Sequence, residues 1–132
     1  MKIEWVEKLR PNLETTIDLV QGKNNAAVLV PIGEHSEATV QCILMTKRTD
    51  KVETHKGQIS FPGGFYENGD ENILKTALRE AYEEVGLEER QIQVLGCLKP
   101  VKTLGEVVIY PWVAKVDFPE RLHLSVEEVE KM

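Results

Sequence analysis

Residues 61–87, FPGGFYENGDENILKTALREAYEEVGL, decide the fold. The Gly63-Gly64 pair is a turn signal that precedes a segment with helical periodicity. We expect a helix over residues 71–85, with Asp70 as its N-cap and Gly86 in a left-handed conformation at its end. Its apolar residues recur at helical spacing and face the core: Leu74, Ala77, Leu78, Ala81 and Val85. The segment therefore predicts a glycine turn that leads into an amphipathic helix.

Three glutamates share another face of this helix. Glu80, Glu83 and Glu84 are spaced i, i+3 and i+4, so their like charges cost about 0.2–0.5 kcal/mol per pair. A solvated acidic face tolerates that cost. However, Arg79 can orient one carboxylate, and Gly63-Gly64 permits a close backbone approach. Carboxylates and a backbone carbonyl are the oxygen ligands that Mg²⁺ or Mn²⁺ prefers. The pattern is thus either a solvated face or a metal platform for an anionic substrate.

The rest of the chain indicates a mixed sheet with helices packed on it. The order of the elements predicts an α+β or α/β/α layered domain that occupies residues 1–132. We expect a short helix at 2–10, a hairpin formed by strands 26–32 and 40–45, a short strand at 58–61, strands at 91–98 and 107–116, and a helical turn that begins near Ser125. Pro111 places the strand at 107–116 at an edge or a bulge.

Charge and composition exclude several functions. A net charge of −6 leaves no general basic surface, which argues against binding nucleic acid or an anionic membrane. Cys42 and Cys97 are isolated in apolar runs, which is typical of buried thiols and not of a zinc site or disulfide framework. The N-terminus lacks a signal-peptide core, and no apolar run approaches the roughly 18 residues of a membrane span. We therefore expect a soluble, cytoplasmic domain.

A cationic segment precedes the glycine turn. Residues 46–58, TKRTDKVETHKGQ, are expected to form a polar loop that carries Lys47, Arg48, Lys51, His55 and Lys56. It is either a solvated loop or a loop that contacts phosphate, since Arg and Lys both suit phosphate oxygens. Its position next to the glycine turn favours phosphate contact.

Residues 79–87, REAYEEVGL, resemble the REUxEExGU half of the Nudix box. Glu71 stands eight positions before Arg79, where the box glutamate is expected. Two features depart from the general box: six residues separate Gly64 from Glu71 where the box has five, and Ala81 is small for its aliphatic position. The longer spacing, preceded by FPGG, is similar to the coenzyme A diphosphatase subgroup of Nudix hydrolases.

An upstream signature of that subgroup, LLTxRS…HxGxxxFPGG, has a counterpart here. Residues 44–49 read LMTKRT and residues 55–64 read HKGQISFPGG, with Thr49 in place of the usual serine. The two motifs together cover about a third of the chain. The resemblance implies a Nudix-type α/β/α sandwich with a mixed β-sheet.

The resemblance also implies a metal site on the helix. Glu80 and Glu84 would be the principal ligands of Mg²⁺ or Mn²⁺, Glu83 an additional ligand, and the Gly64 carbonyl a backbone ligand. Arg79 would orient the glutamates, and Glu71 would help to fix the loop before the helix. The general base would be Glu80 or a later glutamate: Glu127, Glu128 or Glu130.

The implied activity is hydrolysis of a diphosphate linkage in a nucleoside diphosphate joined to another moiety. Coenzyme A or its derivatives would yield 4′-phosphopantetheine and adenosine 3′,5′-bisphosphate. Arg48, His55 and Lys56 would contact the substrate's phosphates, and Phe61 and Gly63 would complete its binding site. The alternatives are hydrolysis of ADP-ribose, NADH or another nucleotide, and a non-catalytic domain that senses a nucleotide.

Members of the subgroup usually continue with another strand and a C-terminal helix, whereas this sequence stops at residues 125–132, SVEEVEKM. We therefore expect a compact variant or a truncated product without those elements, and the resemblance allows a homodimer.

Overall fold

The structure, a computed structural model, describes residues 4–19, 24–34, 41–48, 59–103, 105–116 and 129–131. The helices are α1 (Glu4–Leu9) and α2 (Ile73–Val85), with short 3-10 turns η1 (Arg10–Asn12) and η2 (Glu89–Gln91). The strands are β1 (Asn24–Glu34), β2 (Gln41–Ile43), β3 (Thr46–Arg48), β4 (Ile59–Ser60), β5 (Gly63–Phe65), β6 (Ile92–Cys97), β7 (Val101–Lys102), β8 (Val107–Val116) and β9 (Val129–Lys131). None of the described helices is long and apolar enough to cross a membrane.

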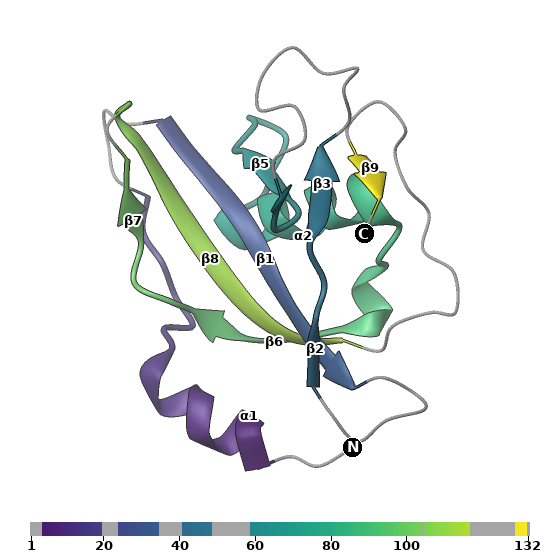
Figure 1. The fold of residues 1–132 in the computed structure, drawn as a ribbon. Coiled ribbons are helices and arrows are strands. Elements are labelled where there is room, and N and C mark those ends of the chain that lie inside the picture. The colour runs from purple at the N-terminus through teal and green to yellow at the C-terminus, as the bar shows by residue number, and fades with distance from the viewer. Residues whose placement is uncertain are drawn as a thin grey trace.

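A six-stranded mixed sheet forms the centre of the molecule (Figure 1). Its main path runs β2-β1-β8-β6, with β5 paired to β1 and β7 paired to β8. Strands β1 and β8 are parallel, whereas the other pairings in this sheet are antiparallel. A second sheet of three strands has the order β4-β3-β9. The mixed sheet expected from the sequence is confirmed.

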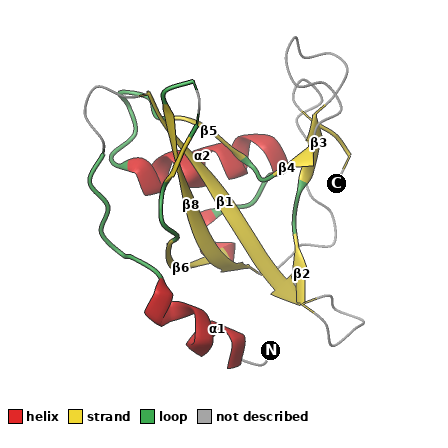
Figure 2. Ribbon diagram, turned by 60° about the vertical axis from the view of Figure 1, so that its left-hand side comes forward, coloured by secondary structure: helices red, strands yellow, loops and turns green. Residues whose placement is uncertain are grey.

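The two helices cover opposite faces of the central sheet (Figure 2). Side chains alternate along a strand, so each of β1 and β8 contributes to both faces. One face packs against α2 through residues that include Ala27, Leu29, Val108, Tyr110 and Trp112. The other packs against α1 through Val30, Ile32, Leu95 and Val113, around Val6. This arrangement of helix, sheet and helix confirms the α+β sandwich.

The expected hairpin and helix are present, with one change of cap. Strands β1 and β2 pair antiparallel, and the turn between them lies outside the described residues. Gly86 ends α2 with a φ of 75°, as expected. The N-cap, however, is Asn72, whose side chain accepts a hydrogen bond from the Lys75 N–H. Asp70 was the wrong choice because its carboxylate has other partners in the site.

Three predictions from local sequence are wrong. Residues 46–48 form strand β3 and not a loop, because β4 and β9 supply antiparallel partners for its backbone. The chain end at 129–131 is strand β9 for the same reason, so no helix extends there. Strand β8 is central and not an edge: it lies between β1 and β6. Pro111 is tolerated because it falls where the partner of β8 changes from β6 to β7.

The N-terminal segment is attached to the sheet at a bulge in β6. Glu14 and Cys97 exchange two backbone hydrogen bonds of 3.0 and 2.7 Å. Gly96, beside them, has a φ of 149°, and a Cβ atom there would lie 2.6 Å from Leu13 Cβ. Only glycine therefore fits this crossing. Cys97 itself is a buried free thiol, as expected, and burial raises its pKa to about 12.

We predict that Gly96→Ala lowers the free energy of unfolding by about 2–4 kcal/mol, because the added methyl meets both backbone strain and overpacking. Urea unfolding followed by circular dichroism measures the loss. Gly69→Ala is the matched control: a Cβ atom at Gly69 meets nothing within 4 Å. Equal stability of the two variants would contradict the role given to Gly96.

Candidate active site

Side chains of α2 occupy the outer edge of strand β5. One edge of β5 pairs with β1, and the other faces α2. The Gly63 N–H donates to Glu84 Oε2 at 3.2 Å, and Arg79 Nη2 donates to the Phe65 carbonyl at 3.1 Å. Side chains of the helix thus supply hydrogen-bond partners for backbone groups of β5 that a neighbouring strand would otherwise pair.

Both glycines are required by this close approach. A Cβ atom on Gly64 would lie 2.5 Å from Cδ of Glu80, so the Glu80 carboxylate lies directly against the Gly64 backbone. A Cβ atom on Gly63 would meet the backbone of β1, 2.8 Å from the Cα atom of Val28. The Gly63-Gly64 pair therefore lets β5 fit between the sheet and the glutamates.

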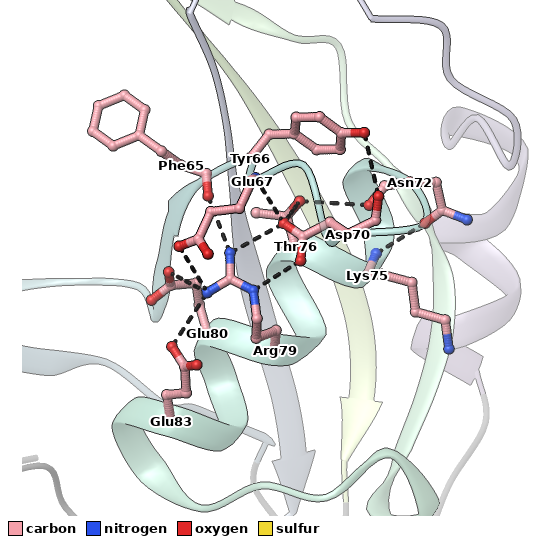
Figure 3. A network of polar contacts seen from close by, with 10 residues as sticks. All are labelled: Phe65, Tyr66, Glu67, Asp70, Asn72, Lys75, Thr76, Arg79, Glu80 and Glu83. Carbon is pink, nitrogen blue, oxygen red and sulfur yellow. Dashed lines mark hydrogen bonds and ion pairs between the residues drawn. The ribbon is translucent and has the colours of Figure 1, made fainter.

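Arg79 is the centre of the polar network around this edge (Figure 3). Its guanidinium donates twice to Asp70, from Nε to Oδ1 at 2.8 Å and from Nη2 to Oδ2 at 3.1 Å. Nη1 donates to Glu80 Oε2 at 3.0 Å and to Glu83 Oε1 at 3.2 Å. A planar fork of donors suits such bidentate pairing. One arginine therefore holds the turn and two of the three glutamates.

Asp70 is buried and fully engaged as an acceptor. Its side chain is 6% exposed, and besides Arg79 it accepts from the Glu67 N–H at 3.0 Å and from Thr76 Oγ1 at 2.8 Å. The hydrogen bonds from Arg79, against an opposing effect of burial, hold the pKa of Asp70 well below its usual range. Pairing with Asp70 likewise raises the pKa of Arg79. Both groups are charged at neutral pH.

The three glutamates differ in burial. Glu84 is 6% exposed and its carboxylate meets the Gly63 N–H, whereas the side chains of Glu80 and Glu83 are 13% and 50% exposed. Glu80 and Glu84 thus lie against Gly64 and Gly63, which form the start of strand β5 and not the turn expected from the sequence. Glu83 lies on the outer side and accepts from Arg79. The structure joins Arg79 to Glu80 and Glu83, and it places Glu84 on the Gly63 N–H of the same strand.

The donor types of this cluster fit a hard divalent cation. The carboxylates of Glu80 and Glu84 meet the backbone of β5, which adds oxygen donors of the kind that Mg²⁺ and Mn²⁺ bind. Within the described ranges, however, no three acidic, His or Cys side chains are gathered closely enough to hold an ion as they stand. Arg79 draws Glu83 outward, so a bound ion needs water or substrate oxygens as further ligands.

The strand register favours the carbonyl of Gly63 over that of Gly64 as the backbone oxygen ligand of a metal ion. The Leu29 N–H donates to the Pro62 carbonyl at 2.9 Å, and hydrogen-bonded pairs recur at every second residue of an antiparallel ladder. The next such pair includes Gly64, whose carbonyl therefore faces β1. The Gly63 N–H faces Glu84. Because the N–H and the carbonyl of one strand residue point to the same edge, the Gly63 carbonyl also faces the glutamates.

The remaining predicted site residues are placed less fully. Phe61 is half-buried between β4 and β5, and Arg48 lies in β3, where the backbone alone is described. Glu130 lies in β9 in the same way. Four residues lie outside the described ranges: His55, Lys56, Glu127 and Glu128. The contacts of the expected phosphate-binding loop and the choice of general base thus stay predictions.

A hollow of about 660 Å³ lies beside α2 and is lined by residues that include Asp70, Lys75, Arg79, Tyr82 and Glu89. It contains neither Glu80 nor Glu84. The Lys75 ammonium is paired with Glu89 at 2.8 Å, which raises the Lys75 pKa. We do not assign the chemistry of the glutamates to this hollow.

A family model described as NUDIX domain matches residues 22–131. The chain belongs to the NUDIX family. It is similar to the uncharacterized Nudix hydrolase NudL of Pectobacterium atrosepticum, with 34% identity over 98% of this chain and 66% of that protein. It is also similar to the peroxisomal coenzyme A diphosphatase ndx-8 of Caenorhabditis elegans, with 36% identity over 85% of this chain and 48% of that protein. The chain thus spans between 48% and 66% of the length of these two relatives.

Solved structures show the same NUDIX fold. An Ap4A hydrolase of Caenorhabditis elegans aligns with a TM-score of 0.66 at 23% identity, over 80% of this chain and 75% of that chain. The NUDIX domain of Shewanella oneidensis NrtR, solved with ADP ribose, aligns with a TM-score of 0.64 at 17% identity, over 95% and 79% of the two chains. At these identities the likeness concerns the fold alone.

Within the NUDIX box, Asp70 and not Glu71 fixes the loop before the helix. Glu71 is exposed, whereas Asp70 forms the bidentate pair with Arg79. The signal was present in the sequence: five residues separate Gly64 from Asp70, as in the general box. A glutamate directly after the aspartate obscures this signal, because the box motif is written with glutamate.

We predict that Asp70→Asn lowers the free energy of unfolding by about 2–3 kcal/mol at pH 7, somewhat less than a fully buried pair because Arg79 is 25% exposed. Glu71→Gln should change it by less than about 0.5 kcal/mol. Urea unfolding of both variants measures the difference. Equal effects would contradict the assignment to Asp70.

The same pair predicts a pH dependence. The folded-state pKa of Asp70 is depressed, so its stabilisation is complete above the ordinary aspartate pKa of about 4 and is lost as the pH falls below it. The stability difference between the original protein and Asp70→Asn should therefore shrink from pH 5 to pH 3. A constant difference over that range would contradict the account.

Proposed function

We propose that the chain hydrolyses the diphosphate linkage of a nucleoside diphosphate joined to another group, with Mg²⁺ or Mn²⁺ as its cofactor. The observation that carries the proposal is the contact of Glu84, which is buried, and of Glu80, whose side chain is 13% exposed, with Gly63 and Gly64 of β5. A plain solvated helix face would leave such carboxylates in water. Family membership adds support, since the matching family model spans residues 22–131.

In this proposal Glu80 and Glu84 hold the ion together with the Gly63 carbonyl, and Glu83 is an additional ligand. When bound there, such an ion would supply positive charge that offsets the phosphate charge and favours attack by water. Asp70 keeps Arg79 in place, and Arg79 orients Glu80 and Glu83. Among the described residues Glu80 is our candidate for the general base, because its carboxylate lies against Gly64, at the strand edge where the diphosphate would bind.

Coenzyme A or a derivative is the proposed substrate. The support is the pair of motifs at residues 44–49 and 55–64, together with the similarity to a relative named as a coenzyme A diphosphatase. Arg48, His55 and Lys56 would bind its phosphates, and Phe61 would line the approach. The products would be 4′-phosphopantetheine, or its acyl form, and adenosine 3′,5′-bisphosphate.

ADP-ribose is the second candidate, as a substrate or as a ligand of a non-catalytic sensor. The fold likeness to a NUDIX domain solved with ADP ribose motivates this alternative. Engagement of Glu80 and Glu84 with the glycines of β5 favours catalysis over sensing.

We predict that the protein with Mg²⁺ or Mn²⁺ cleaves coenzyme A, and that a chelator abolishes the reaction reversibly. Glu84→Gln should lower turnover at least about 100-fold, because it removes an ion ligand. Glu71→Gln, a matched exposed change on the same segment, should leave turnover within about twofold. Chromatography of the products measures each rate.

The substrate panel separates the alternatives. Cleavage of ADP-ribose but not of coenzyme A would reject the substrate assignment and keep the hydrolase. Nucleotide binding without any turnover would favour the sensor. Unchanged activity of Glu84→Gln, with Glu71→Gln as the reference, would reject the metal site on α2.

A further inference from the structure

Four apolar side chains form a row across the face of the central sheet that points away from α2. The strand register places Phe65 beside Ala26, Ala26 beside Ile109, and Ile109 beside Val101. Their sequence neighbours Ala27 and Val108 face α2, so the row faces the opposite side. We call these four residues the apolar row. In Figure 1, β5 and β7 lie beside the upper parts of β1 and β8, away from α1.

The apolar row is exposed at both ends. Phe65 and Val101 are 57% and 52% exposed, whereas Ala26 between them is 8% exposed. Side chains on a solvated sheet face are usually polar. Among the described residues, helix α1 packs on the other half of this face, around Val30, Ile32 and Val113. An uncharged row with exposed ends is thus a candidate binding surface.

The apolar row begins at the candidate active site. Phe65 follows Gly64, against which the Glu80 carboxylate lies, and the Phe65 carbonyl accepts from Arg79. A ligand with its diphosphate at these glutamates could cross β5 and lay one arm along the row. At about 4.8 Å between strands, the row from Phe65 to Val101 is about 14 Å long.

We propose that the apolar row binds the aliphatic arm of the substrate, the part joined to the nucleoside diphosphate. This inference rests on the proposed function. An aliphatic arm gains from an apolar surface, whereas the phosphorylated nucleoside end brings charge that the row has no side chain to neutralise. The row therefore favours diphosphates whose arm is rich in methyl and methylene groups, as in coenzyme A, over those whose arm is a sugar, as in ADP-ribose.

Three probes that share a nucleotide and differ in the arm test this site. They are 3′-phosphoadenosine 5′-diphosphate, which lacks the arm, then coenzyme A, and then hexanoyl-coenzyme A. Isothermal titration in the presence of a chelator measures binding without turnover. We expect coenzyme A to bind roughly tenfold more tightly than the armless probe, and the hexanoyl form to bind more tightly still.

Substitutions in the apolar row should remove this preference selectively. Phe65→Ser and Val101→Ser should each weaken binding of the two armed probes at least about threefold and leave the armless probe unchanged. Ile43→Ser is the matched control, because Ile43 is an apolar strand residue with 53% exposure at the distant edge strand β2. It should leave all three affinities unchanged.

Equal affinity for the three probes, or binding of none, would overturn the proposal, as would equal effects of Ile43→Ser and Phe65→Ser. A second copy of the chain is the alternative occupant of the row, and sedimentation velocity tests it. A dimer that dissociates in Phe65→Ser, with no arm preference, would assign the row to a second copy of the chain.

Hydrolysis of coenzyme A with Mg²⁺ is measured separately. Arm preference without turnover would reject the proposed function alone, and turnover without arm preference would reject the apolar row alone.

Discussion

The bidentate pair between Asp70 and Arg79 is the interaction on which the site depends. A helix of 13 residues is marginal by itself, and three clustered glutamates weaken it further. Arg79 offsets that repulsion by bonding Glu80 and Glu83, and Asp70 anchors Arg79 to the turn before the helix. Each partner is buried enough that losing the other would leave a charge poorly solvated. The pair therefore fixes the acidic side chains relative to β5.

The backbone of β5 makes this arrangement specific. Gly63 and Gly64 have no side chains, so the carboxylates of Glu84 and Glu80 reach the strand itself. The same strand then directs Phe65 to the opposite face, where the apolar row begins. One short strand thus connects the edge that would bind phosphates with the face that would bind an aliphatic arm.

Much of the fold was predictable because it depends on local periodicity. The stripe Leu74 to Val85, the stop at Gly86 and the β1–β2 hairpin follow from short-range patterns. Strands β3 and β9 were missed because their partners are distant in the sequence, and polar composition alone favours a loop there. Asp70 was predicted as the cap because N-cap preference does not distinguish it from Asn72, two positions later. The difference is that Asp70 pairs with Arg79 on the helix, which leaves Asn72 to accept from the Lys75 N–H.

The most direct test of the central claim is anomalous diffraction from crystals of the protein soaked in Mn²⁺. The account predicts an anomalous peak in contact with the Glu80 and Glu84 carboxylates and the Gly63 carbonyl. Absence of a peak there, or a peak confined to the part of the neighbouring hollow that Glu88 and Glu89 line, would contradict it.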